Sequence, residues 1–163
     1  MVHVVIIAHS ELANSYLHCV EQIFLKKINF LHVIGVSSSD DANSILCKIQ
    51  ALIEGFGINN AENNSDYYSA KSLQKSDEAN HEVLILTDIF GATPHNIASK
   101  LIIKHRIELI TGLNLPMLIR AVSYADSGLT ICTQKALDGG ISGIIHINDV
   151  SDVNNVDDIG GNK

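Results

Sequence analysis

The sequence predicts an α/β fold, in which a single domain forms a three-layer sandwich with helices on both faces of a mostly parallel sheet. Three observations lead to this prediction. The chain has 163 residues, of which 46% are hydrophobic and 18% charged, so one domain with a sizeable core is expected. Short continuous apolar runs are typical of strands buried on both faces. These runs alternate with segments whose apolar residues recur at helical spacing, as in βαβ units.

The first half of the chain contains two predicted strands and two predicted helices. Val2 to Ala8 is rich in β-branched residues and predicts the first strand. Glu11 to Leu25 has apolar residues at helical spacing, with Ser10 as the predicted N-cap. Phe30 to Val36 predicts the second strand, and Asp40 to Phe56 predicts a helix with one apolar stripe.

The second half continues the alternation. Its predicted strands are Glu82 to Thr87, Ile107 to Thr111 and a short final strand from Ser142 to Ile147. Its predicted helices are Pro94 to Ile103, Pro116 to Tyr124 and Thr130 to Leu137. We expect the strand order 2-1-3-4, which places a switch point outside the carboxyl ends of the first and third strands. Sheets of this kind bind their ligands at that point.

Two polar segments depart from this pattern. Residues 57–81 are rich in Asn, Ser and Asp and are expected to form an inserted loop. The acidic segment 148–163 is expected to be a disordered tail. The predicted domain therefore spans residues 1–147.

The composition disfavours several classes of function. The formal charge is −7 and the 11 Lys and Arg residues are dispersed, which argues against nucleic-acid binding. The apolar runs are too short to cross a bilayer. Three widely spaced cysteines predict no zinc site and suit a reducing compartment. We therefore expect a cytoplasmic protein.

A histidine and an aspartate follow two strands that should be neighbours. His9 comes directly after the first strand, and Asp88 directly after the third. Because the carboxyl ends of parallel strands meet at one edge of a sheet, the two side chains should face each other. A carboxylate bonded to one imidazole nitrogen fixes the tautomer and leaves the other nitrogen free to attack a phosphoryl group. Each residue alone has a simpler explanation, since most histidines are surface or core residues and Asp is common in turns.

The segment after Asp88 is expected to begin a helix whose N-terminus faces the same crevice. Pro94 suits the first helical position, Thr93 the N-cap, and Gly91 the bend before it. Free backbone N–H groups and the Thr93 hydroxyl would suit phosphoryl oxygens. His95 is either a second functional histidine or a residue of the exposed first turn, and we favour the second interpretation.

Signatures of other chemistries are absent from the sequence. It contains no GxGxxG, no P-loop Gly-Lys-Ser/Thr, no zinc-binding HExxH and no Gly-x-Ser-x-Gly nucleophile elbow. The arrangement of His9 and Asp88 suits phosphoryl chemistry, and the sequence supports these other chemistries poorly. A Ser10 nucleophile is conceivable, but nothing in the sequence identifies its triad partners.

Three segments of the chain resemble the IIA component of the mannose-type (mannose/fructose/sorbose) family of the bacterial phosphoenolpyruvate-dependent sugar phosphotransferase system. They are "VVIIAHSELA", "LILTDIFGATPHNIAS" and "ELITGLNLPMLIRA", and the resemblance extends from about residue 2 to residue 147. It implies a phosphotransferase that works through a phosphohistidine at His9. Asp88 would orient the ring. Thr93, the third predicted catalytic residue, would steady the transferring phosphoryl group together with nearby backbone amides. Ser10, Gly91 and Ala92 would bind the phosphoryl group.

The same resemblance implies partners. The histidine-containing phosphocarrier protein would supply the phosphoryl group, and a IIB component would receive it and pass it to sugar entering through a membrane permease. No metal or nucleotide cofactor is implied. Members of the family form homodimers, in which residues 141–147 would add a strand to the partner's sheet.

The sequence also departs from the family pattern. Ser10 stands where Gly is usual, Ala92 replaces the second Gly of the turn, and His95 replaces an apolar residue. Two alternatives therefore accompany the phosphocarrier prediction. One is a phosphorylation-state regulator that binds a kinase or transcription factor. The other is the phosphoryl-donor subunit of dihydroxyacetone kinase, which ranks lower because its sequence after the third strand usually differs from "DIFGATPHN".

Overall fold

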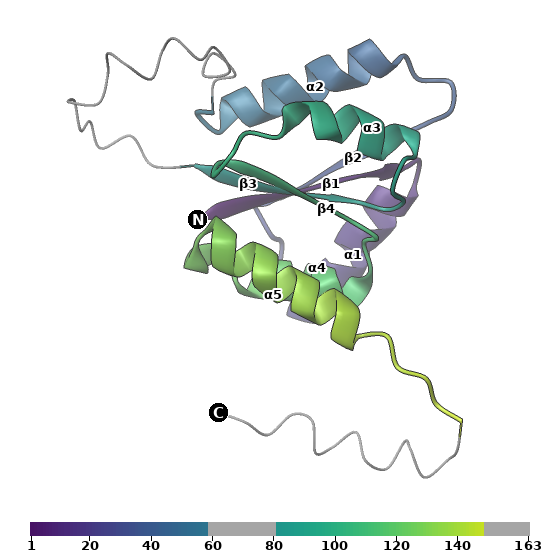
Figure 1. The fold of residues 1–163 in the computed structure, drawn as a ribbon, viewed down its shortest axis with the longest axis vertical. Coiled ribbons are helices and arrows are strands. Elements are labelled where there is room, and N and C mark those ends of the chain that lie inside the picture. Colours follow the sequence, from purple (N-terminus) through teal and green to yellow (C-terminus); the bar gives the residue numbers. More distant parts are fainter. Residues whose placement is uncertain (59–80, 149–163) are drawn as a thin grey trace, which may run out of the picture.

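The computed structural model describes residues 1–58 and 81–148, which form a four-stranded parallel sheet of order β2-β1-β3-β4 (Figure 1). The strands are β1 (Val2–His9), β2 (Leu31–Val36), β3 (Glu82–Thr87) and β4 (Ile107–Thr111). The helices are α1 (Leu12–Phe24), α2 (Ala42–Gly55), α3 (Thr93–Ala98), α4 (Leu115–Ser123) and α5 (Leu129–Ser142), with short 3₁₀ turns η3 (Ser99–Leu101) and η4 (Ala125–Ser127). The predicted α/β class and strand order are confirmed.

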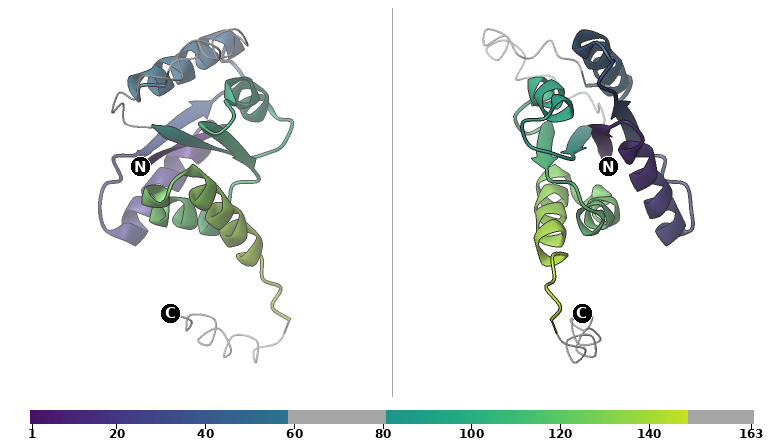
Figure 2. Two further views of the ribbon diagram at one scale, coloured as in Figure 1. Left: turned by 60° about the vertical axis from the view of Figure 1, so that its left-hand side comes forward. Right: turned by 90° about the vertical axis from the view of Figure 1, so that its right-hand side faces the viewer.

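Helices cover both faces of the sheet and create two apolar cores (Figures 1 and 2). On one face, Val4 and Ile6 of β1 pack with residues of α1, α4 and α5. On the other face, Val5 and Ile7 pack with residues of α2 and α3. Because β1 is central and buried from both sides, its sequence is a continuous apolar run rather than an alternating one.

The observed strands agree with the prediction at nearly every residue. β3 and β4 have the predicted bounds, β2 begins one residue later, and β1 extends by one residue to include His9. Since β1 lies between β2 and β3, the crossovers leave it in opposite directions. The switch point therefore lies outside the carboxyl ends of β1 and β3, as predicted.

The prediction of a final strand at Ser142–Ile147 is wrong for the single chain. Helix α5 runs on to Ser142, beyond the predicted end at Leu137, and residues 144–148 have no regular structure. The helix continues through Gly139 and Gly140 because α5 packs closely on α4. A Cβ atom at Gly139 would lie 2.9 Å from the carbonyl oxygen of Pro116. Close packing here outweighs the low helix propensity of glycine.

The predicted polar loop at residues 57–81 and the predicted tail at 148–163 lie almost wholly outside the described residues. Ile58 is an exception, since its side chain is fully buried in the core beneath α2. The ordered structure therefore continues past the predicted start of the loop at Gly57.

His3 and His32 pack against Phe56 at the amino-terminal edge of the sheet, and His81 lies near His3. The His3 ring stacks on Phe56 with 3.9 Å between centroids, and its Nδ1 lies 3.2 Å from His32 Nε2. The His81 ring centroid is 5.7 Å from that of His3. Burial, and then the charges of His32, His81 and the amino terminus, lower the pKa of His3 from 6.5 to about 4.

This cluster predicts an acid-sensitive contribution to stability. The folded state holds His3 neutral, so its contribution is complete above pH 6.5 and is lost as the pH falls from 6.5 toward 4. Since His3 is only half-buried, we expect a loss on the order of 1 kcal/mol. Urea unfolding between pH 7.5 and 4.5 should show the wild-type midpoint falling more steeply than that of His3→Phe, whose ring can still stack on Phe56. Equal slopes for the two proteins would contradict the prediction.

Candidate functional site

His9 and Asp88 meet at the carboxyl edge of the sheet, at the ends of the neighbouring strands β1 and β3. One carboxylate oxygen, Asp88 Oδ2, accepts the backbone N–H of His9 at 2.9 Å and lies 2.6 Å from the ring Nδ1 of the same residue. The other oxygen, Oδ1, accepts the backbone N–H of Ile89 at 2.9 Å. The carboxylate therefore holds His9 at two points, main chain and ring.

The surroundings of Asp88 favour its ionised form. Its side chain is only 6% exposed, and burial alone would raise its pKa. The hydrogen bonds from the His9 backbone and ring and from the Ile89 N–H outweigh burial and lower the pKa of Asp88 below its ordinary value. An ionised carboxylate only accepts hydrogen bonds, so the proton of the neutral His9 ring must be on Nδ1. The lone pair is then on Nε2, on a side chain that is 45% exposed.

The main chain turns sharply directly after His9. Ser10 has a φ of 37°, in the left-handed region, and its N–H donates to the carbonyl of Val36 at 2.9 Å. The prediction of Ser10 as the N-cap of α1 is wrong, because the cap position is Glu11. A left-handed residue explains why glycine would be easily accommodated at position 10.

The turn between Asp88 and α3 has the predicted bend but a different cap. Gly91 has a φ of 78°, which favours glycine, and Ala92 has a φ of −75°, which any residue adopts. The N-cap is Ala92, whose carbonyl accepts the Asn96 N–H at 2.9 Å. The prediction of Thr93 as the cap is therefore wrong. Thr93 is the first helical residue, followed by Pro94, and its side chain is exposed.

His95 is half-buried rather than exposed. Its ring packs against that of Phe90 with 4.7 Å between centroids, and its Nδ1 is buried without a hydrogen-bond partner among the described residues. Among the described residues, the hydrogen bonds of His9 and Asp88 do not include His95. The structure therefore brings His9 and Asp88 together, whereas the His95 ring packs against Phe90.

The surface around His9 is acidic and partly apolar. Ile89 and Phe90 are 60% and 76% exposed, and Leu12 is also exposed. An open hollow of about 350 Å³ begins at Ser10, the residue after His9, and includes Glu11 and Asp40 in its lining. The loops at this edge, residues 9–11, 37–41, 88–92 and 112–114, contain no Lys or Arg.

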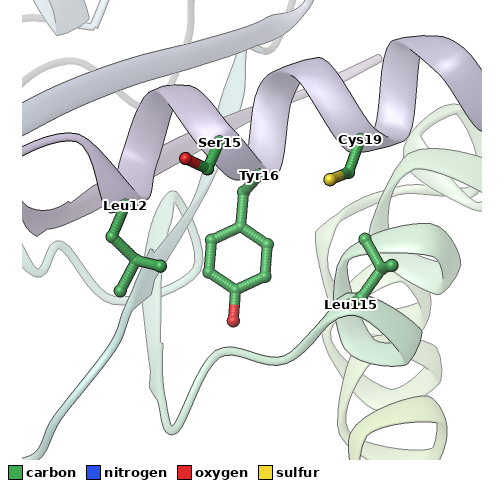
Figure 3. Close-up of a pocket in the computed structure, with 5 residues that line it drawn as sticks. All are labelled: Leu12, Ser15, Tyr16, Cys19 and Leu115. Atoms are coloured by element: carbon green, nitrogen blue, oxygen red, sulfur yellow. The ribbon is translucent and has the colours of Figure 1, made fainter.

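A second pocket lies along α1, on the side that faces Leu115 (Figure 3). It is formed by Leu12, Ser15, Tyr16, Cys19 and Leu115 and includes neither His9 nor Asp88. The Tyr16 hydroxyl donates to the carbonyl of Leu113 at 3.0 Å and so ties α1 to the loop after β4. Burial and the nearby Asp88 raise the pKa of Tyr16, which keeps this donor protonated. Sequence reasoning missed this contact, because it joins residues 97 positions apart.

Neither a metal-binding cluster nor a membrane span is present in the described part of the chain. Across residues 1–58 and 81–148, no three His, Cys, Asp or Glu side chains gather so that they could hold a metal ion. In the same residues, no helix combines the length and apolarity needed to span a bilayer.

Comparison with protein families finds one match. The model of the family EIIA-man, described as "PTS system fructose IIA component", matches residues 51–132, about half of the chain. The matched region contains Asp88 and Thr93 and begins after His9.

Two curated relatives and a solved structure agree with that family. The PTS system fructose-specific EIIA component of Bacillus subtilis (strain 168) is 48% identical over 47 residues, which are 28% of this chain and 32% of that relative. The PTS system sorbose-specific EIIA component of Lacticaseibacillus casei is 25% identical over 125 residues, 76% of this chain and 74% of the relative. The crystal structure of phosphotransferase system component EIIA from Streptococcus agalactiae has a TM-score of 0.69 at 22% identity and covers 90% of this chain and 97% of its own. The structural likeness establishes a shared fold.

The site geometry predicts a single tautomer of His9. At a pH where the ring is neutral, ¹⁵N spectra should show the proton on Nδ1 in the wild type. In Asp88→Ala the acceptor is gone, so the spectra should shift toward the Nε2–H form. Asp40→Asn removes a carboxylate at the same edge that does not touch His9, and it should leave the tautomer unchanged. An Nε2–H ring in the wild type would contradict the assigned hydrogen bond.

Proposed function

The chain belongs to the mannose-type IIA family of the sugar phosphotransferase system, and from this membership we propose that it is a cytoplasmic phosphocarrier with His9 as its phosphorylated residue. The observation that carries the proposal is the pair of hydrogen bonds from His9 to one oxygen of Asp88, at 2.9 and 2.6 Å. These bonds prepare an exposed Nε2 lone pair at the switch point of the sheet.

The proposed reaction is a direct displacement at phosphorus. The Nε2 lone pair attacks the phosphoryl group carried by a donor histidine, the bond from phosphorus to the donor nitrogen breaks, and the donor ring leaves with that electron pair. Positive charge then develops on the His9 ring. Opposite charges about 4 Å apart attract by roughly 4 kcal/mol at an effective dielectric of 20, so Asp88 stabilises this charge. Transfer to an acceptor is the reverse displacement.

The phosphoryl oxygens need hydrogen-bond donors around Nε2. We assign this role to Thr93, whose exposed hydroxyl lies at the start of α3, and to the turns that contain Ser10, Gly91 and Ala92. The left-handed φ of Gly91 bends the chain between Asp88 and Thr93. Ser10 and Ala92 stand where the family pattern usually has glycine. Ala92 has a φ that any residue adopts, whereas Ser10 has a left-handed φ of 37°, which favours glycine.

We further propose two protein partners: the histidine-containing phosphocarrier protein as donor and a IIB component as acceptor. The surface around His9 suits a partner with an apolar patch bordered by basic residues. Ile89 and Phe90 supply exposed apolar area, and Glu11 and Asp40 supply negative charge on loops without Lys or Arg. Complementary charge speeds the encounter of two proteins and selects against acidic partners.

We also propose that the protein is a homodimer in which the segment after α5 pairs with the partner's sheet. β4 is an edge strand, so one side of its backbone is unpaired within the sheet. Ile144, Ile145 and Ile147 are each more than half exposed in the single chain. An extended apolar segment and an open strand edge can pair by strand addition.

Phosphorylation of His9 can be tested by mass. Incubation with phosphoenolpyruvate, the first enzyme of the system and the phosphocarrier protein should add one acid-labile group of about 80 Da, as expected for a single phosphohistidine. The addition should be lost in His9→Ala. His95→Ala is the matched control and should keep it, since the hydrogen bonds of the pair do not include His95. Retention of the addition in His9→Ala would overturn the proposal.

The dimer can be tested by sedimentation of two truncated chains. A chain that ends at Asn148 keeps the isoleucine segment and should sediment as a dimer. A chain that ends at Gly143 lacks it and should sediment as a monomer with an unchanged circular dichroism spectrum per residue, because residues 144–148 make no regular structure. A monomeric full-length protein would contradict the proposed assembly.

A further inference from the structure

We propose that Gly35 is a positioning residue for His9: because it has no side chain, the peptide that follows His9 can cross the end of β2 and hold the imidazole against Asp88. Gly35 touches no reacting atom, so its effect is exerted through the backbone. The expected effect of Gly35 on the phosphorylation rate rests on the proposed phosphocarrier function. Its expected effect on the position of the His9 ring does not.

The crossing is defined by the register of the central strands. Ala8 pairs with Gly35 and His9 pairs with Val36 in the parallel ladder between β1 and β2. The chain then turns at Ser10 through its left-handed φ of 37°, while the Ser10 N–H donates to the Val36 carbonyl at 2.9 Å. This turn carries the carbonyl of Ser10 directly over Gly35.

A side chain at position 35 would collide with that carbonyl. A Cβ atom there would lie 2.4 Å from the carbonyl oxygen of Ser10 and 3.2 Å from its carbonyl carbon. Both contacts are with backbone, so no rotation of a flexible side chain can relieve them. The situation differs at Gly140, where the closest atom to an added Cβ is the terminal methyl of Met117. Gly35 itself has an ordinary φ, so the contact alone excludes a side chain.

A displaced Ser10 peptide would disturb the catalytic pair. Ser10 is joined directly to His9, and both the main-chain N–H and the ring Nδ1 of His9 bond the same oxygen of Asp88. A backbone shift of a few tenths of an ångström or more at Ser10 must rotate or translate His9. The two bonds share one acceptor atom, so they cannot both survive such a movement unchanged.

Gly35 is not part of either apolar core. It is exposed and contributes to the lining of the open hollow beside His9, together with Ser10 and Ser37. The residues of β2 that pack in the two cores stand at its other positions, such as Leu31 and Val36. A methyl group at position 35 should therefore disturb the turn and leave the fold in place.

The test compares Gly35→Ala with Gly55→Ala. Gly55 lies in α2, and a Cβ atom there has no neighbour within 4 Å, so this variant controls for the addition of a methyl group. Gly35→Ala should keep its circular dichroism spectrum and be phosphorylated at least about tenfold more slowly, since small misplacements of reacting groups slow reactions strongly. Its ¹⁵N spectrum should show a mixture of His9 tautomers. Gly55→Ala should match the wild type in rate and in tautomer.

A double-mutant cycle with Asp88→Asn shows whether Gly35 acts through the pair. If it does, Gly35→Ala combined with Asp88→Asn should be about as slow as Asp88→Asn alone. If the double variant is slowed by the product of the two single effects, Gly35 acts independently of the pair of His9 and Asp88, and the proposal is overturned.

Each remaining outcome also decides the question. A wild-type rate and a single tautomer in Gly35→Ala would overturn the positioning role, as would loss of the folded state, because Gly35 would then serve the fold as a whole. A wild-type protein that is not phosphorylated would overturn the phosphocarrier function. The tautomer comparison would in that case still test whether Gly35 positions the ring.

Discussion

One carboxylate oxygen connects the fold to the chemistry. Asp88 Oδ2 accepts hydrogen bonds from the main chain and the ring of His9, and so joins the ends of two central strands. The carbonyl of Asp88 accepts the Gly112 N–H at 3.1 Å, which adds the loop after β4 to the same arrangement. A nearly buried carboxylate held by three donors has little freedom to move. The imidazole therefore has a fixed tautomer and a fixed direction before any partner arrives, which is the preorganisation that fast group transfer requires.

The parallel sheet brings several loops together around His9. All four strands end at the same edge, so their following loops surround His9, and those loops contain acidic residues without Lys or Arg. The histidines near Phe56 lie at the opposite edge, where the strands begin. His3, whose contribution to stability depends on pH, is thus separated from the residues assigned to transfer by the length of the sheet. Changes at one edge can be tested with little disturbance of the other.

The sequence was sufficient to predict the strands, their order and the meeting of His9 with Asp88. Each depends on short apolar runs and on the rule that parallel strands end together, which are local or general features. The helix caps were predicted less well. Ser10 and Thr93 have typical cap side chains, yet each lies one residue away from the observed cap position. Cap geometry depends on how the whole turn is held, and the Ser10 turn is held by β2.

Long-range contacts were beyond sequence reasoning. Nothing local marks Gly35, because its importance comes from the carbonyl of Ser10, 25 positions earlier. The final strand was predicted from isoleucines that pair with no strand within the described residues. Helix α5 includes Ser142, the first residue of that predicted strand. Ile58 was assigned to a polar loop by its neighbours, although its own side chain is in the core. In each case the composition of a segment indicates its local preference, but it does not indicate which distant residues pack against it.

The central claim is that Asp88 occupies Nδ1 of His9 and leaves Nε2 as the only nitrogen able to receive a phosphoryl group. The most direct measurement is NMR of the phosphorylated, ¹⁵N-labelled protein, in which coupling to ³¹P identifies the modified ring nitrogen. The account predicts a phosphoryl group on Nε2 and a proton on Nδ1. A phosphoryl group on Nδ1 would require the bond to Asp88 to be broken, and it would contradict the account.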